Sequence, residues 1–293
     1  MSILQKLIVF TALLFAGILS TNAQSILLKN GNSITPKVAL STMLDSVYAL
    51  KTSRFEMVSR ERIDGEMNQN RAKGYVNYHP KKVFLRGLHE DGELANEIIY
   101  LEGSNNNNAL VSPNGFPYIN LNLDPLGSTM RHNRHLTILE AGGQYLADML
   151  RIGMRYYKKN NDSTQRFFIE RESEGLLKLT ISNPDYTYIN YTVLPNEQVR
   201  DLCFRLGIPE YKLVEINEEV DDFYDLSEGQ TIKIPNYYTK KFELIIREKD
   251  FIPVHVKAYD DLGLYAEYEY LYFDCNVKVD DQTFNSENPA YTF

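Results

Sequence analysis

The sequence predicts an α+β fold: a large antiparallel sheet with helices on one face, and a small strand–helix–helix–strand unit inserted near its end. Short strand-like segments follow one another with only turn-forming residues between them, which is typical of antiparallel neighbours. Two stretches, residues 34–51 and 136–158, carry apolar residues at helical spacing instead. Residues 191–236 hold the pattern of the small unit, and host sequence flanks them on both sides.

The N-terminus has the pattern of a secretory signal peptide. Lys6 precedes an apolar run over residues 7–19, and small residues precede Gln24. We therefore expect residues 1–23 to be removed by cleavage near Ala23. The apolar run is short for a membrane span. The mature protein is expected to be exported, soluble and periplasmic, and not to span a membrane.

Composition restricts the possible partners. The formal net charge is −8 at pH 7, which argues against a nucleic-acid partner because binding phosphates requires a basic face. No phosphate loop, dinucleotide fingerprint or nucleophile motif is present, so we predict no enzyme activity, no catalytic residues and no cofactor. Cys203 and Cys275 could form a disulfide in an oxidising compartment, but two free thiols are the favoured alternative.

The host begins with a predicted helix over residues 34–51, where Pro36 suits the first turn. Strands then follow. Those before the second helical stretch are predicted near residues 55–57, 74–78, 82–86 and 97–101.

The second helical stretch, residues 136–158, contains Gly142 and Gly143 in its interior. Each glycine costs about 1 kcal/mol relative to alanine in a helix, so the pair predicts close approach by a neighbouring element. Tyr and Glu alternate in the last predicted strand, as a sheet with one covered face requires. The later strands are predicted at residues 166–170, 176–180, 242–246, 254–257 and 266–273.

Residues 191–236 resemble a LysM module, the family that grips N-acetylglucosamine polymers in cell walls. The resemblance rests on Gly207-Ile208 after the first helix, Asn217 after the second, and the strand over 231–234. It implies a peptidoglycan or other N-acetylglucosamine glycan as partner. The usual Gly-Asp-Thr of the first loop is replaced here, so a LysM scaffold kept as a packing surface remains the alternative. The implied glycan-binding residues are Asn196, Glu197, Gln198, Ile216, Asn217 and Glu218.

The host resembles bacterial domain-of-unknown-function family 1571, within the superfamily of LolA-like lipoprotein carriers. Motifs over residues 123–127, 130–135 and 140–142 carry the resemblance, together with the C-terminal run over 252–293. The resemblance implies a LolA-like half-barrel whose sheet and helices enclose a cavity. The predicted domains are residues 24–190 and 237–293 for the host and 191–236 for the insert.

The family motif contains a polar junction formed by Arg131, Asn133, Arg134 and His135. We expect these side chains to satisfy buried carbonyl groups and the start of the helix rather than to contact a ligand. His132, His135 and Glu140 are weak candidates for a zinc site, because the histidines precede the helix and their convergence is not assured. The acidic segment 218–228 lacks EF-hand spacing and is predicted to be a solvated loop, so no metal site is predicted.

The sequence therefore predicts an exported periplasmic binding protein. An apolar ligand, a lipid or acyl chain, would occupy the cavity between sheet and helices, and the LysM-like insert would attach the protein to peptidoglycan. The alternative is a non-enzymatic structural or interaction scaffold of the cell envelope with no ligand in the cavity.

Overall fold

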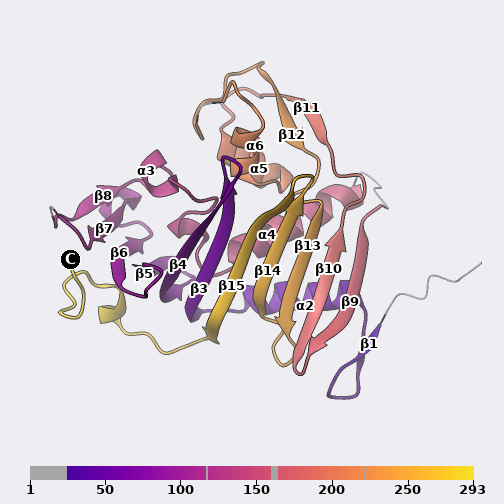
Figure 1. Ribbon diagram of the computed structural model, residues 1–293, viewed down its shortest axis with the longest axis horizontal. Coiled ribbons are helices and arrows are strands. Elements are labelled where there is room, and N and C mark those ends of the chain that lie inside the picture. Colours follow the sequence, from indigo (N-terminus) through magenta and orange to yellow (C-terminus); the bar gives the residue numbers. More distant parts are fainter. Residues whose placement is uncertain (1–24, 117, 160–163, 221) are drawn as a thin grey trace, which may run out of the picture.

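The computed structural model describes residues 25–116, 118–159, 164–220 and 222–293. The predicted signal peptide lies outside the described residues. An eleven-stranded antiparallel sheet forms the body of the molecule (Figure 1), in the order β8-β7-β6-β5-β4-β3-β15-β14-β13-β10-β9. Its strands are β3 (Thr52–Ile63), β4 (Glu66–Asn77), β5 (Lys82–Leu88), β6 (Leu94–Leu101), β7 (Ala109–Pro113), β8 (Leu121–Leu123), β9 (Arg166–Ser173), β10 (Leu176–Ser182), β13 (Lys241–Arg247), β14 (Pro253–Asp260) and β15 (Gly263–Cys275).

Strands from opposite ends of the chain meet in the middle of the sheet. β3 pairs with β4 on one side and with β15 on the other, with Phe55 opposite Phe273 and Glu61 opposite Ala266. The first long strand of the chain therefore pairs with the last one, and the residues between them form the long loop that this pairing closes.

Helices cover one face of the sheet, as predicted. α2 (Pro36–Tyr48) and α4 (Gln144–Lys159) lie behind the strands in Figure 1. The apolar stripe of α2, with Leu40 and Met43 almost fully buried, packs into one core with the inward side chains of the sheet, such as Leu177 and Leu244. The predicted fold class is confirmed.

The predicted insert has the expected order of elements: β11 (Tyr188–Thr192), α5 (Val199–Leu206), α6 (Glu210–Glu215) and β12 (Thr231–Pro235). β11 pairs only with β12 in a separate two-stranded sheet, and the unit has a small core of its own around Leu202 and Leu213. It sits beyond one end of the main sheet (Figure 1). Gly207 ends α5 in the left-handed conformation, and a Cβ there would lie 2.9 Å from the backbone nitrogen of Gly153 in α4, so the two helices meet closely.

The prediction of one helix over residues 136–158 is wrong. A short 3-10 turn, η2 (Ile138–Glu140), is separated from α4 by Gly142 and Gly143, whose φ angles of 98° and 86° are left-handed. The pair forms the turn before α4 rather than its interior, so its cost in helix propensity does not arise. The predicted close approach is correct, because the Tyr78 hydroxyl donates to the Gly142 carbonyl at 2.6 Å.

Five further strands and helices have weak sequence signals and were not predicted. They are β1 (Ile26–Leu27), β2 (Ser33–Ile34), β7, the edge strand β8 and α3 (Ser128–Arg131). Each is five residues long or shorter. Periodicity has too few positions to show itself in segments of this length.

The first prediction concerns Gly142. A Cβ at this position would lie 2.6 Å from the Tyr78 hydroxyl oxygen, in addition to the strain of the positive φ. We expect Gly142→Ala to reduce the free energy of unfolding by about 3 kcal/mol, from steric overlap plus backbone strain. Urea denaturation measures it. The matched control is Gly143→Ala, which has a similar φ but open space, and should cost only about 1 kcal/mol; equal losses in both variants would contradict the proposed overlap.

Cys203 and Cys275 are both free thiols. Cys203 is fully buried in the core of the small unit, whereas Cys275 lies at the end of β15 beside Arg247, whose Nη2 is 3.2 Å from the sulfur. The structure agrees with the favoured alternative, in which both thiols are free.

Candidate functional site: a cavity between sheet and helical cover

A cavity of about 150 Å³ lies between the inner face of the sheet and the segment that runs from α3 to the start of α4. Most of its wall is carbon, and its apolar lining comes from both layers. An engineered protein cavity of this volume holds a molecule of about the size of benzene. The space therefore fits a short alkyl segment as it stands. Its apolar lining includes Phe55, Met57, Ala72, Leu85, Ile98, Leu146, Phe242, Val256 and Tyr270.

The character of the wall changes along β3. Alternate residues of a strand face the same side, and Phe55, Met57, Ser59 and Glu61 all line the cavity. The series runs from apolar to polar over six residues, which corresponds to roughly 20 Å at 3.3 Å per residue. The neighbouring strand β4 follows the same trend, since the lining residue opposite Met57 is Ala72 and the one opposite Ser59 is Asn70. The cavity thus has an apolar end and a polar end.

Two charged side chains of opposite sign stand at the polar end. Glu61 is 2% exposed and accepts a hydrogen bond of 2.6 Å from the Tyr268 hydroxyl. Burial raises the pKa of Glu61, opposed by that hydrogen bond and by the charge of Arg134. Arg134 also lines the cavity, and burial lowers its pKa, opposed by the charge of Glu61. Among the described residues the two make no direct ion pair, so both keep hydrogen-bonding capacity facing the cavity.

The residues of the predicted polar junction have different roles in the structure. Arg131 is buried and its Nη2 lies 2.6 Å from Glu210 of α6, while Asn133 is exposed with a left-handed φ of 54°. His135 is buried, with Nε2 2.9 Å from the Arg62 carbonyl oxygen, so that nitrogen carries the proton. Only Arg134 faces the cavity. Of the junction's buried side chains, that of His135 contacts a backbone carbonyl and that of Arg131 contacts a carboxylate.

His135 is held between rings from both parts of the chain. Tyr265 of β15 and Tyr211 of α6 stack on its two faces, with ring centroids 4.2 and 4.7 Å away. Burial lowers the pKa of His135 to about 3, and the charges of Lys212 and Arg62 lower it too. The imidazole is therefore neutral and serves as a packing element between the sheet and the small unit.

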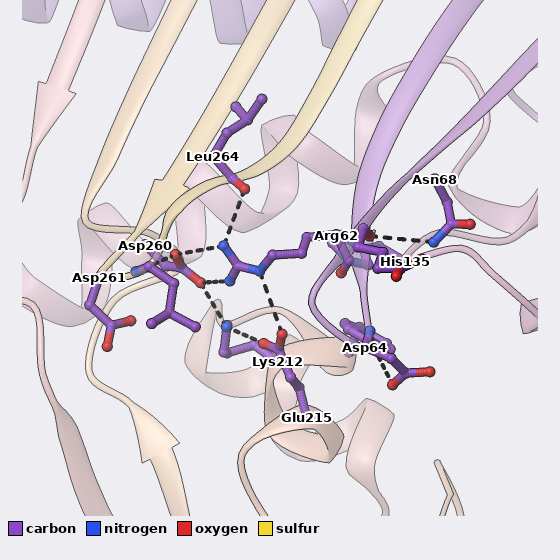
Figure 2. A network of polar contacts seen from close by, with 12 residues as sticks. Arg62, Asp64, Asn68, His135, Lys212, Glu215, Asp260, Asp261 and Leu264 are labelled. Carbon is purple, nitrogen blue, oxygen red and sulfur yellow. Dashed lines mark hydrogen bonds and ion pairs between the residues drawn. The ribbon is translucent and has the colours of Figure 1, made fainter.

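A buried ionic network joins the small unit to the sheet (Figure 2). Arg62 of β3 pairs with Asp260 at the end of β14, and Lys212 of α6 lies 2.7 Å from the same carboxylate. Glu215 of α6 completes the network through Lys212 and Arg62. The side chains of Lys212 and Asp260 are 1% and 2% exposed. Burial alone would raise the pKa of Asp260, but hydrogen bonds from Arg62 and Lys212 outweigh it and hold the pKa below its ordinary value.

A second buried network connects the small unit to the cover of the cavity. Arg200 of α5 lies 2.7 Å from Glu140 and 2.9 Å from Glu210, which in turn binds Arg131. Glu140 is also part of the cavity wall and caps Thr137 through its backbone nitrogen. The helical cover is consequently fixed to the small unit by charged contacts at Arg131 and at the last residue of η2, Glu140.

The predicted glycan-binding residues do not gather in one place. Glu197 is buried and pairs with Arg205, and Asn217 bridges the chain by hydrogen bonds to Leu213 and Lys233. An open hollow of about 380 Å³ is lined by Ile216, Asn217 and Glu218, with Asn190 and residues 231–233 opposite. Residues 196–198 are not part of its wall. The two predicted loops therefore do not share a single groove.

Sequence reasoning did not identify Glu61, Tyr265 or Tyr268 as site residues. Glu61 lies within β3, where its inward position is visible only once the register with β15 is known. The Tyr265 hydroxyl is buried, and no described residue forms a hydrogen bond with it. An available signal was the polar interruption at Ser59 and Glu61 of a face that begins with Phe55 and Met57.

Neither a metal centre nor a membrane helix is found in the described part of the chain. No group of three or more His, Cys, Asp or Glu residues there is arranged to hold a metal ion. His135 makes its contacts with Arg62 and the two tyrosine rings, and Glu140 with Thr137 and Arg200. Among the described residues, no helix has the length and apolar character to cross a membrane.

Distant structural likeness to several solved proteins is found. MucB of Pseudomonas aeruginosa, in its complex with MucA, superposes with a TM-score of 0.38 at 11% identity, covering 86% of this chain and 60% of that one. The lipoprotein LppX of Mycobacterium tuberculosis gives 0.37 at 10% identity, covering 84% and 98%. A putative outer-membrane lipoprotein-sorting protein domain from Vibrio parahaemolyticus gives 0.33 at 8% identity, covering 86% and 97%. No function is transferred from likeness at this level.

The family match is more direct. No curated protein matches the sequence. The model of a protein family of unknown function, DUF1571, matches residues 51–212, which is more than half of the chain. The match runs from β3 through the polar junction and α5 as far as Lys212, and so extends into the predicted insert. The chain therefore belongs to the DUF1571 family.

Proposed function

We propose that this protein binds an apolar ligand, a lipid or acyl chain, between the inner face of its sheet and the helical cover. The observation that carries the proposal is the lined cavity itself, because protein interiors are close-packed and hold few voids larger than a water molecule. A scaffold with no ligand would be expected to fill the same space with its many tyrosine and phenylalanine side chains.

Ligand uptake by the delipidated protein tests the proposal. The chain has no tryptophan, so an apolar dye such as N-phenyl-1-naphthylamine can be followed by its fluorescence with little background. We expect saturable enhancement at one dye per protein. Short-chain alkyl compounds should displace the dye, with affinity rising by up to about 0.8 kcal/mol for each methylene group until the cavity is filled.

A cavity-filling substitution provides the specific control. Ala72 lines the cavity from β4, so Ala72→Phe should abolish dye uptake while the far-ultraviolet circular dichroism stays unchanged. Ala95→Phe, on β6 of the same sheet but outside the cavity wall, should leave uptake intact. Absence of saturable uptake by the wild-type protein would instead favour the envelope scaffold without a cavity ligand.

Attachment to peptidoglycan through the small unit stays a second proposal, supported by the open polar hollow beside Ile216, Asn217 and Glu218. Deleting residues 191–236 is a poor test, because it would remove Lys212 and Glu215 from the network around Asp260 and take Arg200 away from Glu140. A substitution at the exposed Thr231 in the hollow, Thr231→Tyr, avoids this problem. Loss of binding to purified sacculi in Thr231→Tyr supports the role. Absence of binding by the wild-type protein refutes it.

A further inference from the structure

We infer that the polar end of the cavity selects an amphiphile with an uncharged, hydroxyl- or carbonyl-bearing head group. The inference rests on the proposed function and specifies the class of ligand. The relevant groups are Glu61, Arg134 and the hydroxyl of Tyr265, all part of the cavity wall. The alkyl chain of the ligand would run along β3 toward Phe55.

Charge balance is the first argument. Arg134 and Glu61 offset each other, and the remaining acidic group of the wall, Glu140, is already paired with Arg200 at 2.7 Å. The charges of the wall and their direct partners thus sum to about zero. A buried charge without a partner is expensive. An ionised head group of either sign would add a buried charge without a partner. A neutral head group leaves the net charge of the wall and its partners near zero.

Hydrogen-bonding capacity is the second argument. The side chain of Tyr265 is almost fully buried, and its hydroxyl has no hydrogen-bond partner among the described residues, although buried hydroxyls are rarely left unpaired. The Tyr268 hydroxyl and the backbone N–H of His135 both donate to Glu61, and a carboxylate accepts up to about four hydrogen bonds. Within the described part of the chain, the guanidinium of Arg134 makes one long hydrogen bond, to the His132 carbonyl at 3.4 Å. A hydroxyl group both donates and accepts, so it is able to meet the acceptor Glu61 together with a donor from Arg134 or Tyr265.

Location is the third argument. Glu61 and Ser59 follow Met57 and Phe55 on the same face of one strand, so the polar groups stand at one end of the space and the apolar groups at the other. This is the distribution that an amphiphile with a single head group requires. A purely apolar ligand would leave Glu61 and Arg134 without a partner in the cavity.

Three probes of equal chain length test the inference: octanol, octanoate and octylamine, each displacing N-phenyl-1-naphthylamine at pH 7.5. Wild-type protein should bind octanol at least about tenfold more tightly than either ion, because each ion brings one uncompensated buried charge. Glu61→Gln leaves Arg134 alone and should place octanoate above octylamine. Arg134→Gln leaves Glu61 alone and should place octylamine above octanoate.

Glu66→Gln is the matched control, since Glu66 is an exposed carboxylate at the start of β4 and should leave the three affinities unchanged. Dye uptake with no preference among the three probes would overturn the inference while cavity binding stands. A ranking in the wild-type protein with octanoate or octylamine first would overturn it as well, and this comparison needs no variant to fold. Absence of any dye uptake would refute the proposed function instead.

Discussion

Asp260→Asn should cost about 3–5 kcal/mol of unfolding free energy, the largest loss expected from one substitution in this chain. The Asp260 carboxylate is the shared partner of Arg62 and Lys212, all three side chains being at most 8% exposed. Neutralising Asp260 leaves two buried cations with Glu215 as their one shared carboxylate, and an uncompensated buried charge costs far more than the complete group contributes. Thermal or urea unfolding measures the loss.

Two comparisons separate this explanation from a general effect of losing a carboxylate. Glu174→Gln removes an exposed ion pair with Lys29, whose side chains are 89% and 55% exposed, and should cost less than about 1 kcal/mol. The double variant Asp260→Asn/Lys212→Met removes one of the stranded cations and should recover part of the stability. A double variant less stable than Asp260→Asn would contradict the account.

Stability should fall as the pH is lowered from about 6.5, because of His135. In the unfolded chain this histidine titrates near its ordinary pKa of about 6.5. In the folded protein burial lowers the pKa to about 3. Because the pKa of His135 is lower in the folded state, its contribution to the free energy of unfolding is fully present above about pH 6.5. This contribution is lost as the pH falls from about 6.5 toward 3. The loss approaches about 1.4 kcal/mol for each pH unit below 6.

His135→Gln removes this slope without introducing a charge, so its unfolding free energy should depend less steeply on pH between 6.5 and 4.5. Glu61 acts in the opposite sense, since burial raises its pKa and protonation in the fold then adds stability as the pH falls. The comparison of wild type and variant cancels that contribution. His89→Gln, in an exposed turn, is the control and should keep the full slope. Parallel pH profiles of wild type and His135→Gln would refute the assignment.

The architecture of the sheet could be predicted from the sequence because its strands have strong local signals. The alternation in Phe55 to Glu61 and in residues 266–273 depends only on which face is buried, and turn-forming residues mark the ends. The helix of residues 34–51 likewise appears as Pro36–Tyr48. The break at Gly142 and Gly143 was misjudged because spacing alone cannot distinguish a glycine inside a helix from one in a left-handed turn before it.

The candidate site was less accessible to sequence reasoning. Glu61 and Arg134 are 73 residues apart, and their shared place on the cavity wall follows from the pairing of β3 with β15 and from the path of the helical cover. The sequence predicts Arg131 and His135 as members of a polar junction, but their partners Glu210 and Tyr211 lie in the predicted insert. Contacts between residues that are far apart in the sequence produce no periodic pattern in it.

The pairing of β3 with β15 also determines when this molecule can fold. Until residues 263–275 have been synthesised, β3 carries a row of unpaired backbone groups and one apolar side, the arrangement that favours aggregation. Closing so long a loop is entropically slow. Completion of the sheet therefore waits for residues 263–275, and a chaperone that covers the open side of β3 until then would protect the chain from aggregation.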